Sequence, residues 1–463
     1  MPRDTQAEIV IGRKRRRTST LLHVRNMPAD DRTTSADAKR PPKVAVIFAC
    51  LLTAGFVGLW IYKSVSKETH QFKFDFAPYY AAWFAASVSH DFYETETGKG
   101  GLHGNVFAEL KADMGIDGDF SAYIYPPQFA WMGSWIARVR YETAQTCWVW
   151  INAGLWLACV GALMGRSLAG RPVFAACLVV LALLYPPMAY SLSLGQVNIV
   201  LFAMIVSAAW LMARDRSVLA GALLGVAALV KPHLGLLWIY LLWKRQWKAA
   251  GSCVVTVLIL TGGALVSLGI EPFHTYMFDV LPKISGGQAY IANQSVYGVL
   301  ARVFVSDPAY LFADRLMESH FWIDMLSLAA GLAIIVLTFR AIPQSAAAER
   351  SSETVSLEFA AVICALLLAN KIATIHHFTW VWLAIPAYAT AVLRGAVRPP
   401  RNEIIAFVVG VGLLFLTWKF FAWFNGQSGL LRLLACNTFA GALLIWICLI
   451  RLLRRAGHVE PSA

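Results

Sequence analysis

Long apolar segments recur along most of this chain and are separated by shorter polar segments. Most of them approach the length of about 20 residues that an α-helix needs to cross a membrane. The runs fall at residues 44–62, 144–164, 172–190, 197–213, 217–231, 233–243, 249–269, 321–342, 355–370, 378–394, 404–422 and 431–450. The pattern predicts an all-α polytopic membrane protein with about 12 transmembrane helices.

Two neighbouring runs, 217–231 and 233–243, are too short to cross a membrane comfortably, and Pro232 separates them. Broken helices at membrane depth persist only where protein or a watery cavity surrounds the freed backbone groups. The break therefore indicates a site. The apolar segment 125–138 is also short and begins with Tyr-Pro-Pro, so we expect it to lie half-inserted or in the interface.

The composition argues against a soluble protein and against a nucleic-acid partner. Hydrophobic residues make up 58% of the chain and charged residues 14%, whereas soluble domains carry about 25% charged residues. The net charge of +13 falls largely beside apolar runs, where membrane topology explains it. All eight cysteines lie in apolar runs without a CxxC pair, so we expect neither disulfides nor a zinc site.

The basic residues also predict an orientation. If the N-terminus is cytoplasmic, the short loops rich in Arg and Lys alternate as the positive-inside rule requires. We then expect a disordered basic tail at 1–43 that anionic membrane lipids attract, a transmembrane domain at 44–455 and a second cytoplasmic tail at 456–463. Large external loops are predicted at 63–143 and 271–320. Within the first, interfacial amphipathic helices are predicted near 77–90 and 105–113.

Polar residues that are costly in a membrane gather on the predicted external side. They comprise a carboxylate, amides, two cations and histidines, together with a tyrosine of the first Tyr-Pro-Pro motif. These residues are Asp75, Tyr125, Gln196, Asn198, Lys231, His233, Asn293, Gln294, Arg302, His376 and His377. Their clustering on one side is a stronger signal than any one of them.

Each of these residues also has a purely structural interpretation. Asp75 can be a solvated loop acid, and Gln196 and Asn198 can cap a helix. Lys231 can extend to the surface along its apolar stem.

The two adjacent histidines also have a structural interpretation. His376 and His377 can be packing residues, and neighbours on a helix point about 100° apart, so at most one easily faces a shared cavity. Without a third ligand, the pair predicts no metal site.

A carboxylate that faces cations suits glycosyl transfer from a lipid-linked sugar phosphate. Asp75 would deprotonate the acceptor hydroxyl, while Lys231, a histidine and Arg302 would stabilise the departing phosphate, whose charge grows in the transition state. The bilayer accommodates the lipid tail. The chain has no Gly-rich phosphate loop, as expected for a donor that is not a nucleotide.

Several motifs carry a resemblance to a known family. They are FDFAPYYAAW (74–83), DFYE (91–94), YIYPPQFAWM (123–132), LSLGQVNIVLF (192–202), AGALLGVAALVKPHLGLL (220–237), IANQSVYGVLAR (291–302) and NKIATIHHFTWVW (370–382). In order and spacing they resemble glycosyltransferase family 87, the polytopic enzymes related to polyprenol-phosphate-mannose-dependent mannosyltransferases. The segment from GQVN to KP is the most specific.

The resemblance implies a bundle of the GT-C type in a bacterial inner membrane, with external loop helices over the active site. It makes Asp75 the catalytic base and one of His376 and His377 the active-site histidine. Lys231, Gln196 and Asn293 would contact the donor phosphate or sugar. The implied partners are a polyprenyl-phosphate sugar, most simply mannose, and a lipid or glycan acceptor. No cofactor is expected, and a divalent-metal requirement stays open.

Two other functions remain in competition. About twelve spans with both ends in the cytoplasm is a common plan for secondary transporters, which hold polar residues near the midplane at related points of two repeats. Here the polar residues crowd one rim, and the first external loop is unusually long. A non-catalytic scaffold for envelope assembly is the third possibility, and it predicts that Asp75 is dispensable.

Overall fold

Helices are the regular elements of the described part of the chain. The computed structural model describes residues 42–93, 115–116, 122–167, 170–305, 307, 309–312, 317, 320–344, 352–395, 397–416 and 418–458. Within these residues no strand forms, and an isolated β-bridge joins Asn293 to Thr374. The all-α class is therefore confirmed. Most of the predicted basic tail and the predicted amphipathic helix near 105–113 lie outside the described residues.

Five of the described helices are long and apolar enough to cross a membrane. They are α1 (Lys43–Trp60, continued by η1, Ile61–Val65, and α2, Ser66–Thr69), α6 (Tyr141–Ser167), α12 (Trp247–Leu268), α17 (Phe321–Ala341) and α18 (Ser352–Ala369). Two bent pairs raise the number to as many as seven: α7 (Pro172–Leu183) with α8 (Pro186–Leu194), and η8 (Gly429–Ala435) with α22 (Asn437–His458). The molecule has the character of a multi-pass membrane protein, but these helices do not confirm the predicted twelve spans.

The remaining helices are shorter than the predicted runs. Those within the apolar runs are α9 (Asn198–Met212), α10 (Ser217–Val230), η4 (Pro232–Leu234), α11 (Gly235–Trp243), α19 (Ala384–Leu393), α20 (Arg401–Phe415) and α21 (Trp418–Asn425). Those between the runs are α3 (Phe76–Ser87), α5 (Pro127–Gly133), η3 (Ile136–Arg138), α13 (Glu271–Thr275), η5 (Tyr276–Val280), α14 (Leu281–Ile284), α15 (Val296–Phe304) and α16 (Ala309–Phe312). A 3₁₀ helix, η7 (Ile375–Leu383), leads directly into α19.

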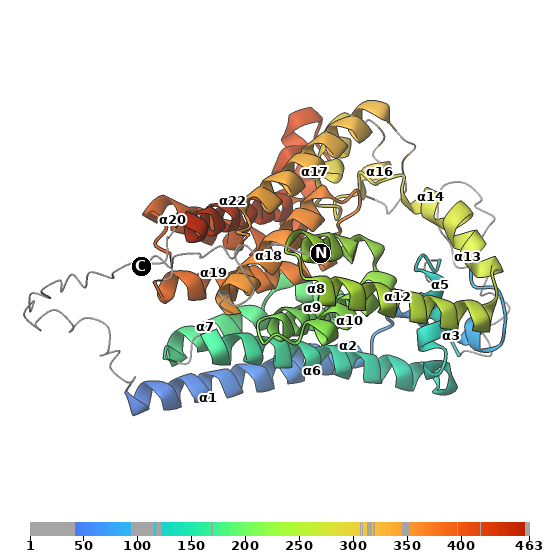
Figure 1. Cartoon of the computed structure of the whole chain (residues 1–463), viewed down its shortest axis with the longest axis horizontal. Coiled ribbons are helices and arrows are strands. Elements are labelled where there is room, and N and C mark those ends of the chain that lie inside the picture. The colour runs from blue at the N-terminus through green and yellow to red at the C-terminus, as the bar shows by residue number, and fades with distance from the viewer. Residues whose placement is uncertain are drawn as a thin grey trace, which may run out of the picture. The chain divides into compact units, whose positions relative to one another are not determined.

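Helix α18 is the centre of the described bundle. Thirteen of its 18 residues are buried, and it contacts α9, α11, α17, α19 and α22 (Figure 1). Its buried Glu358 accepts hydrogen bonds from the Lys244 ammonium (2.8 Å) and the Tyr240 hydroxyl (2.6 Å). Because Tyr240 lies on α11 and Lys244 follows it, these bonds fix α11, and with it the helix break at Lys231, against the core.

The short helices α3 and α5 pack against each other, and Figure 1 shows them close to one end of α12. Nine of the twelve residues of α3 are buried. Trp83 of α3 donates a hydrogen bond to the Phe129 carbonyl (3.0 Å) and packs edge-on against the Phe129 ring. The expectation of an interfacial amphipathic helix near 77–90 is therefore wrong: a helix forms there, but protein surrounds it.

Helices α10 and α12 approach closely at Gly221, as small residues allow. A Cβ atom at Gly221 would lie 2.0 Å from the Ala249 carbonyl oxygen. We expect Gly221→Val to lower the free energy of unfolding by about 1–3 kcal/mol, the usual cost of overpacking. Thermal denaturation in detergent measures this loss of stability. Gly154→Val on α6 is the control, since a Cβ there meets nothing within 4 Å; equal melting of the two variants would contradict the close contact.

Candidate active site

Asp75 directly precedes α3 and is held by the turn that follows α8. Its backbone N–H donates to the Leu194 carbonyl (2.9 Å), and the Gln196 side-chain amide donates to its Oδ2 (2.6 Å). Between these two partners, Gly195 ends α8 with a φ of +73°. A Cβ atom there would lie 2.8 Å from Phe76 Cβ and 2.9 Å from Lys73 Cβ. Only glycine combines this left-handed conformation with so close an approach.

Two tyrosine hydroxyls fix the orientation of Gln196. The Tyr79 and Tyr125 hydroxyls are hydrogen-bonded to each other (2.7 Å) and face Gln196 Oε1, the shared acceptor, from 3.0 and 3.4 Å. Burial raises the pKa of both phenols above its usual range, so they stay protonated and act as donors. With its oxygen occupied, Gln196 turns its NH₂ group toward Asp75. The carboxylate therefore has a built hydrogen-bond donor that holds it in place.

Lys231 occupies the break between α10 and η4. Its backbone is extended (φ −131°, ψ 98°), which the following proline favours. The side chain is only 5% exposed, and its Nζ lies 2.7 Å from His377 Nε2 and 5.7 Å from the centre of the Tyr125 ring. Asp75 and Lys231 are also close enough to interact electrostatically. The structure thus brings together the acid, the amide, the amine and the histidine that the sequence singles out.

Of the two adjacent histidines, His377 faces Lys231. Its Nδ1 accepts from the backbone N–H of Thr374 (3.0 Å), as in a capping box at the start of η7. The Thr374 hydroxyl bonds both histidines, His377 through Nδ1 (2.9 Å) and His376 through Nε2 (2.7 Å), and His376 also lies beside the Tyr190 ring. His233 packs edge-on against His377. In the described residues, no group of three or more His, Cys, Asp or Glu could hold a metal ion.

Asn293 and Gln294 are bonded to the backbone of the segment that leads to the histidines. The Asn293 side chain donates to Lys371 O (2.9 Å) and accepts from the Ala373 N–H (2.9 Å). The Gln294 backbone N–H donates to Ala373 O (2.8 Å), and its side chain accepts from the Phe439 N–H (3.0 Å). These contacts position η7 and give the two amides a scaffolding role.

Arg302 makes no hydrogen bond to Asp75, Lys231 or His377 among the described contacts. It is fully buried, and its guanidinium donates to the carbonyls of Tyr290 (3.0 Å) and Asn293 (2.6 Å) and to Cys436 Sγ (3.0 Å). These bonds join α15 to the loop before it and to the segment before α22. The predicted phosphate contact has no support in this geometry.

Asn198, at the start of α9, is also buried, and its carbonyl accepts from Trp380 Nε1 (2.9 Å). Among the described residues, neither atom of its side-chain amide has a hydrogen-bond partner. Its predicted helix-capping alternative is therefore not realised by its side chain.

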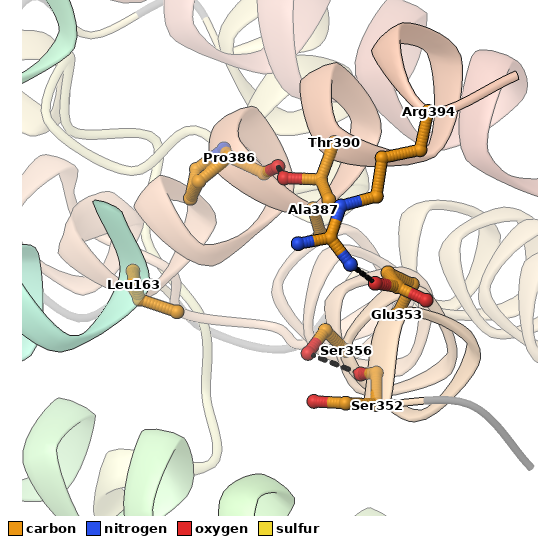
Figure 2. Close-up of a pocket in the computed structure, with 8 residues that line it drawn as sticks. All are labelled: Leu163, Ser352, Glu353, Ser356, Pro386, Ala387, Thr390 and Arg394. Carbon is orange, nitrogen blue, oxygen red and sulfur yellow. Dashed lines mark hydrogen bonds and ion pairs between the residues drawn. The ribbon is translucent and has the colours of Figure 1, made fainter. Parts of the chain in front are cut away.

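A pocket of about 160 Å³ lies elsewhere and belongs to a different part of the fold. Figure 2 shows its lining, Leu163, Ser352, Glu353, Ser356, Pro386, Ala387, Thr390 and Arg394, with an ion pair between Arg394 and Glu353. Gln145, which accepts from the Lys73 N–H, and Leu163 lie on the same helix. The 18 residues between Gln145, on the side of Asp75, and Leu163, in the pocket, correspond to about 27 Å along the helix. The pocket is therefore remote from Asp75.

Comparisons with known proteins settle the family. The sequence profile described as "Glycosyltransferase family 87" matches residues 123–369, more than half of the chain. The chain belongs to glycosyltransferase family 87. It is also 26% identical over 396 residues to the polyprenol-phosphate-mannose-dependent alpha-(1-2)-phosphatidylinositol pentamannoside mannosyltransferase of Mycobacterium tuberculosis (strain CDC 1551 / Oshkosh), covering 84% of this chain and 80% of that protein.

The region matched to family 87 contains Tyr125, Gln196 and Lys231, whereas Asp75 and His377 lie outside it. The bonds from Gln196 to Asp75 and from Lys231 to His377 join these outer residues to the matched region. Membership of family 87 and the apolar helices together make this protein a membrane glycosyltransferase. The predicted resemblance is confirmed, and the transporter alternative is not favoured.

Tyr79 and Thr374 also belong to the site, although their sequence signals are weak. Tyr79 lies one helical turn after Asp75, within a run of aromatic residues that reads as apolar. Thr374 lies two and three residues before the histidines, a spacing typical of a capping box. Both signals were present in the sequence, but each is common in purely structural settings.

Proposed function

We propose that this protein is an inverting glycosyltransferase that transfers a sugar, which we take to be mannose, from a polyprenyl-phosphate donor to a hydroxyl of a lipid or glycan acceptor. We place the reaction on the external face of a bacterial inner membrane, with both termini cytoplasmic. The observation that carries the proposal is a set of three interactions: Gln196 bonds Asp75, Lys231 bonds His377, and Asp75 interacts electrostatically with Lys231. Gln196 and Lys231 belong to the region matched to family 87.

In the proposed reaction, the acceptor oxygen attacks the anomeric carbon while the Asp75 carboxylate takes the hydroxyl proton. The bond between the anomeric carbon and the phosphate oxygen breaks, and its electron pair leaves with the polyprenyl phosphate. Lys231 lies on the side of the departing phosphate. A single displacement of this kind inverts the anomeric configuration.

The name of the mycobacterial relative supports the donor class, since that protein depends on polyprenol-phosphate-mannose. The same name gives a phosphoinositol glycolipid as its acceptor. For this chain we propose the broader class of membrane-anchored glycans with a free sugar hydroxyl. Asn293 and Gln294 would hold the segment before η7 in place without touching the donor, and Arg302 would support Asn293 through its carbonyl.

A transfer assay tests the proposed function. Purified protein in lipid nanodiscs would be given polyprenyl-phosphate mannose and an envelope glycolipid extract, and mass spectrometry would detect the extended glycolipid and free polyprenyl phosphate. We expect both products in equal amounts. Uptake of a free sugar into proteoliposomes without any transfer would instead support a transporter. Envelope glycolipids compared with and without the protein would identify the acceptor.

Gln196 is expected to act by positioning Asp75. Gln196→Leu removes the donor to the carboxylate and the acceptor of both tyrosine hydroxyls. We expect kcat to fall about 10²-fold, since small displacements of a reacting group cost that much, with little change in KM for the donor. Steady-state kinetics measure both constants. Gln71→Leu, at an exposed position of the segment before α3 that carries Asp75, should have wild-type kinetics; equal activity of both variants would contradict this role.

A further inference from the structure

The hydrogen bonds of His377 determine where its proton lies. The backbone N–H of Thr374 points at Nδ1 from 3.0 Å, and a backbone nitrogen can only donate. Nδ1 therefore carries no hydrogen and acts as the acceptor. A neutral imidazole with one accepting nitrogen has its hydrogen on the other, so His377 is the Nε2–H tautomer.

This tautomer constrains Lys231. His377 Nε2 lies 2.7 Å from Lys231 Nζ, so the Nε2–H group must donate to the lysine nitrogen. An ammonium has no lone pair and cannot accept a hydrogen bond, whereas a neutral amine can. The bond therefore requires Lys231 to be an uncharged amine while the site is free of substrate.

Burial is the feature of the surroundings that favours an uncharged Lys231 amine, whereas the nearby carboxylate of Asp75 favours its protonation. The side chain is almost fully buried, and burial without full hydration disfavours a charge. His377 bonds it, His233 and His376 lie close enough to interact with it electrostatically, and the Tyr125 and Trp380 rings flank it. Asp75 is the acidic group that interacts with it. A neutral lysine that interacts electrostatically with a carboxylate base can receive the proton that the base takes up.

We infer that Lys231 is neutral before the reaction and ends it as an ammonium, holding the proton that Asp75 removes from the acceptor hydroxyl. This inference rests on the proposed function and specifies the final proton acceptor within the same site. Lys231 thus acts as an acid–base group, and its positive charge appears only when the leaving phosphate needs it. A fixed cation, as expected from the sequence, would be charged throughout.

The charges balance in this scheme. The donor is a phosphodiester with one negative charge, and the product polyprenyl phosphate is a monoester that gains a second one as the glycosidic bond to phosphate breaks. The proton leaves the acceptor hydroxyl, passes through Asp75 and reaches the Lys231 amine, so Asp75 returns to its carboxylate form. The net charge of the buried site stays constant, and the new ammonium neutralises the new phosphate charge.

Proton uptake on product binding tests the inference without turnover. Calorimetric titration of the protein with a short-chain prenyl phosphate, in two buffers of different ionisation enthalpy at about pH 8, measures the protons bound per ligand. The phosphate monoester is already a dianion at this pH, since its second pKa is about 6. We expect the wild-type protein to take up about one proton per prenyl phosphate bound.

Two variants assign the proton to Lys231. Lys231→Arg is permanently charged, and Lys231→Met keeps the stem without the amine, so both should bind prenyl phosphate without proton uptake. Binding by the wild type without proton uptake would overturn the inference alone, as would undiminished uptake in either variant. Absence of any prenyl phosphate binding by folded wild-type protein would overturn the proposed donor class and the inference together.

Discussion

Replacing Asp75 by asparagine is expected to lower kcat/KM for glycosyl transfer by about 10²–10⁴-fold, the usual contribution of a general base. Asparagine preserves the size of the side chain but cannot take a proton. It also places an amide where Gln196 donates to the carboxylate, so the orientation of the remaining group changes as well. Donor binding should persist, because Asp75 acts on the acceptor side of the anomeric carbon.

The measurement is the initial rate of transfer from polyprenyl-phosphate mannose, with thermal melting as the check on folding. Asp215→Asn is the matched control, since Asp215 is exposed and has a φ of +58°, which asparagine also adopts readily. It should retain wild-type rates. A folded Asp75→Asn protein with an undiminished rate would remove Asp75 from the chemistry.

Lys231→Met and Lys231→Arg are both expected to lower kcat by about 10²–10³-fold, within the usual contribution of an acid–base group, because neither side chain can accept the proton. Methionine can neither accept the proton nor become charged. Arginine is charged but cannot accept a proton, since its guanidinium stays protonated in proteins. The Nε2–H of His377 would also lose its acceptor in both variants. Arginine therefore should not rescue the activity that methionine loses.

Single-turnover transfer with saturating donor measures this effect on the chemical step. Lys67→Arg and Lys67→Met, at an exposed position beyond α1, supply the matched pair of controls and should leave the rate unchanged. Near-wild-type transfer by a folded Lys231→Arg protein would show that a fixed positive charge suffices at this position.

The apolar runs predict where helices form, but they do not predict how many of these helices cross the membrane. Run 404–422 was expected to be one helix, yet α20 ends at Phe415 and α21 begins at Trp418. Run 172–190 bends by 42° before Pro186, where the residue preceding proline leaves the helical conformation. An apolar run indicates only that the segment is shielded from water. Either lipid or surrounding protein can shield it. The buried helix α3 could not be distinguished from an interfacial one for the same reason.

The candidate site was predictable in part, because a helix break beside a lysine is costly and has to be explained. The helix break points to Lys231, and the one-sided clustering of polar residues points to Asp75 and Gln196. The sequence pattern does not distinguish these residues from the structural Arg302, because a backbone carbonyl satisfies a buried donor as well as a phosphate does. The choice between the two histidines depends on the capping contact of Thr374 with His377, and the spacing that suggests this contact is too common in helix starts to be decisive.

The most direct test of the proposed site is a structure of the protein with a polyprenyl phosphonate analogue of the mannose donor. In this analogue a methylene group replaces the oxygen between the sugar and the phosphorus, so transfer is blocked. We expect the phosphonate to lie against Lys231 and the opposite face of the anomeric carbon to face Asp75, with room for an acceptor hydroxyl between them. A donor bound in the pocket of Glu353 and Arg394, or with its phosphonate against Asp75, would contradict the account.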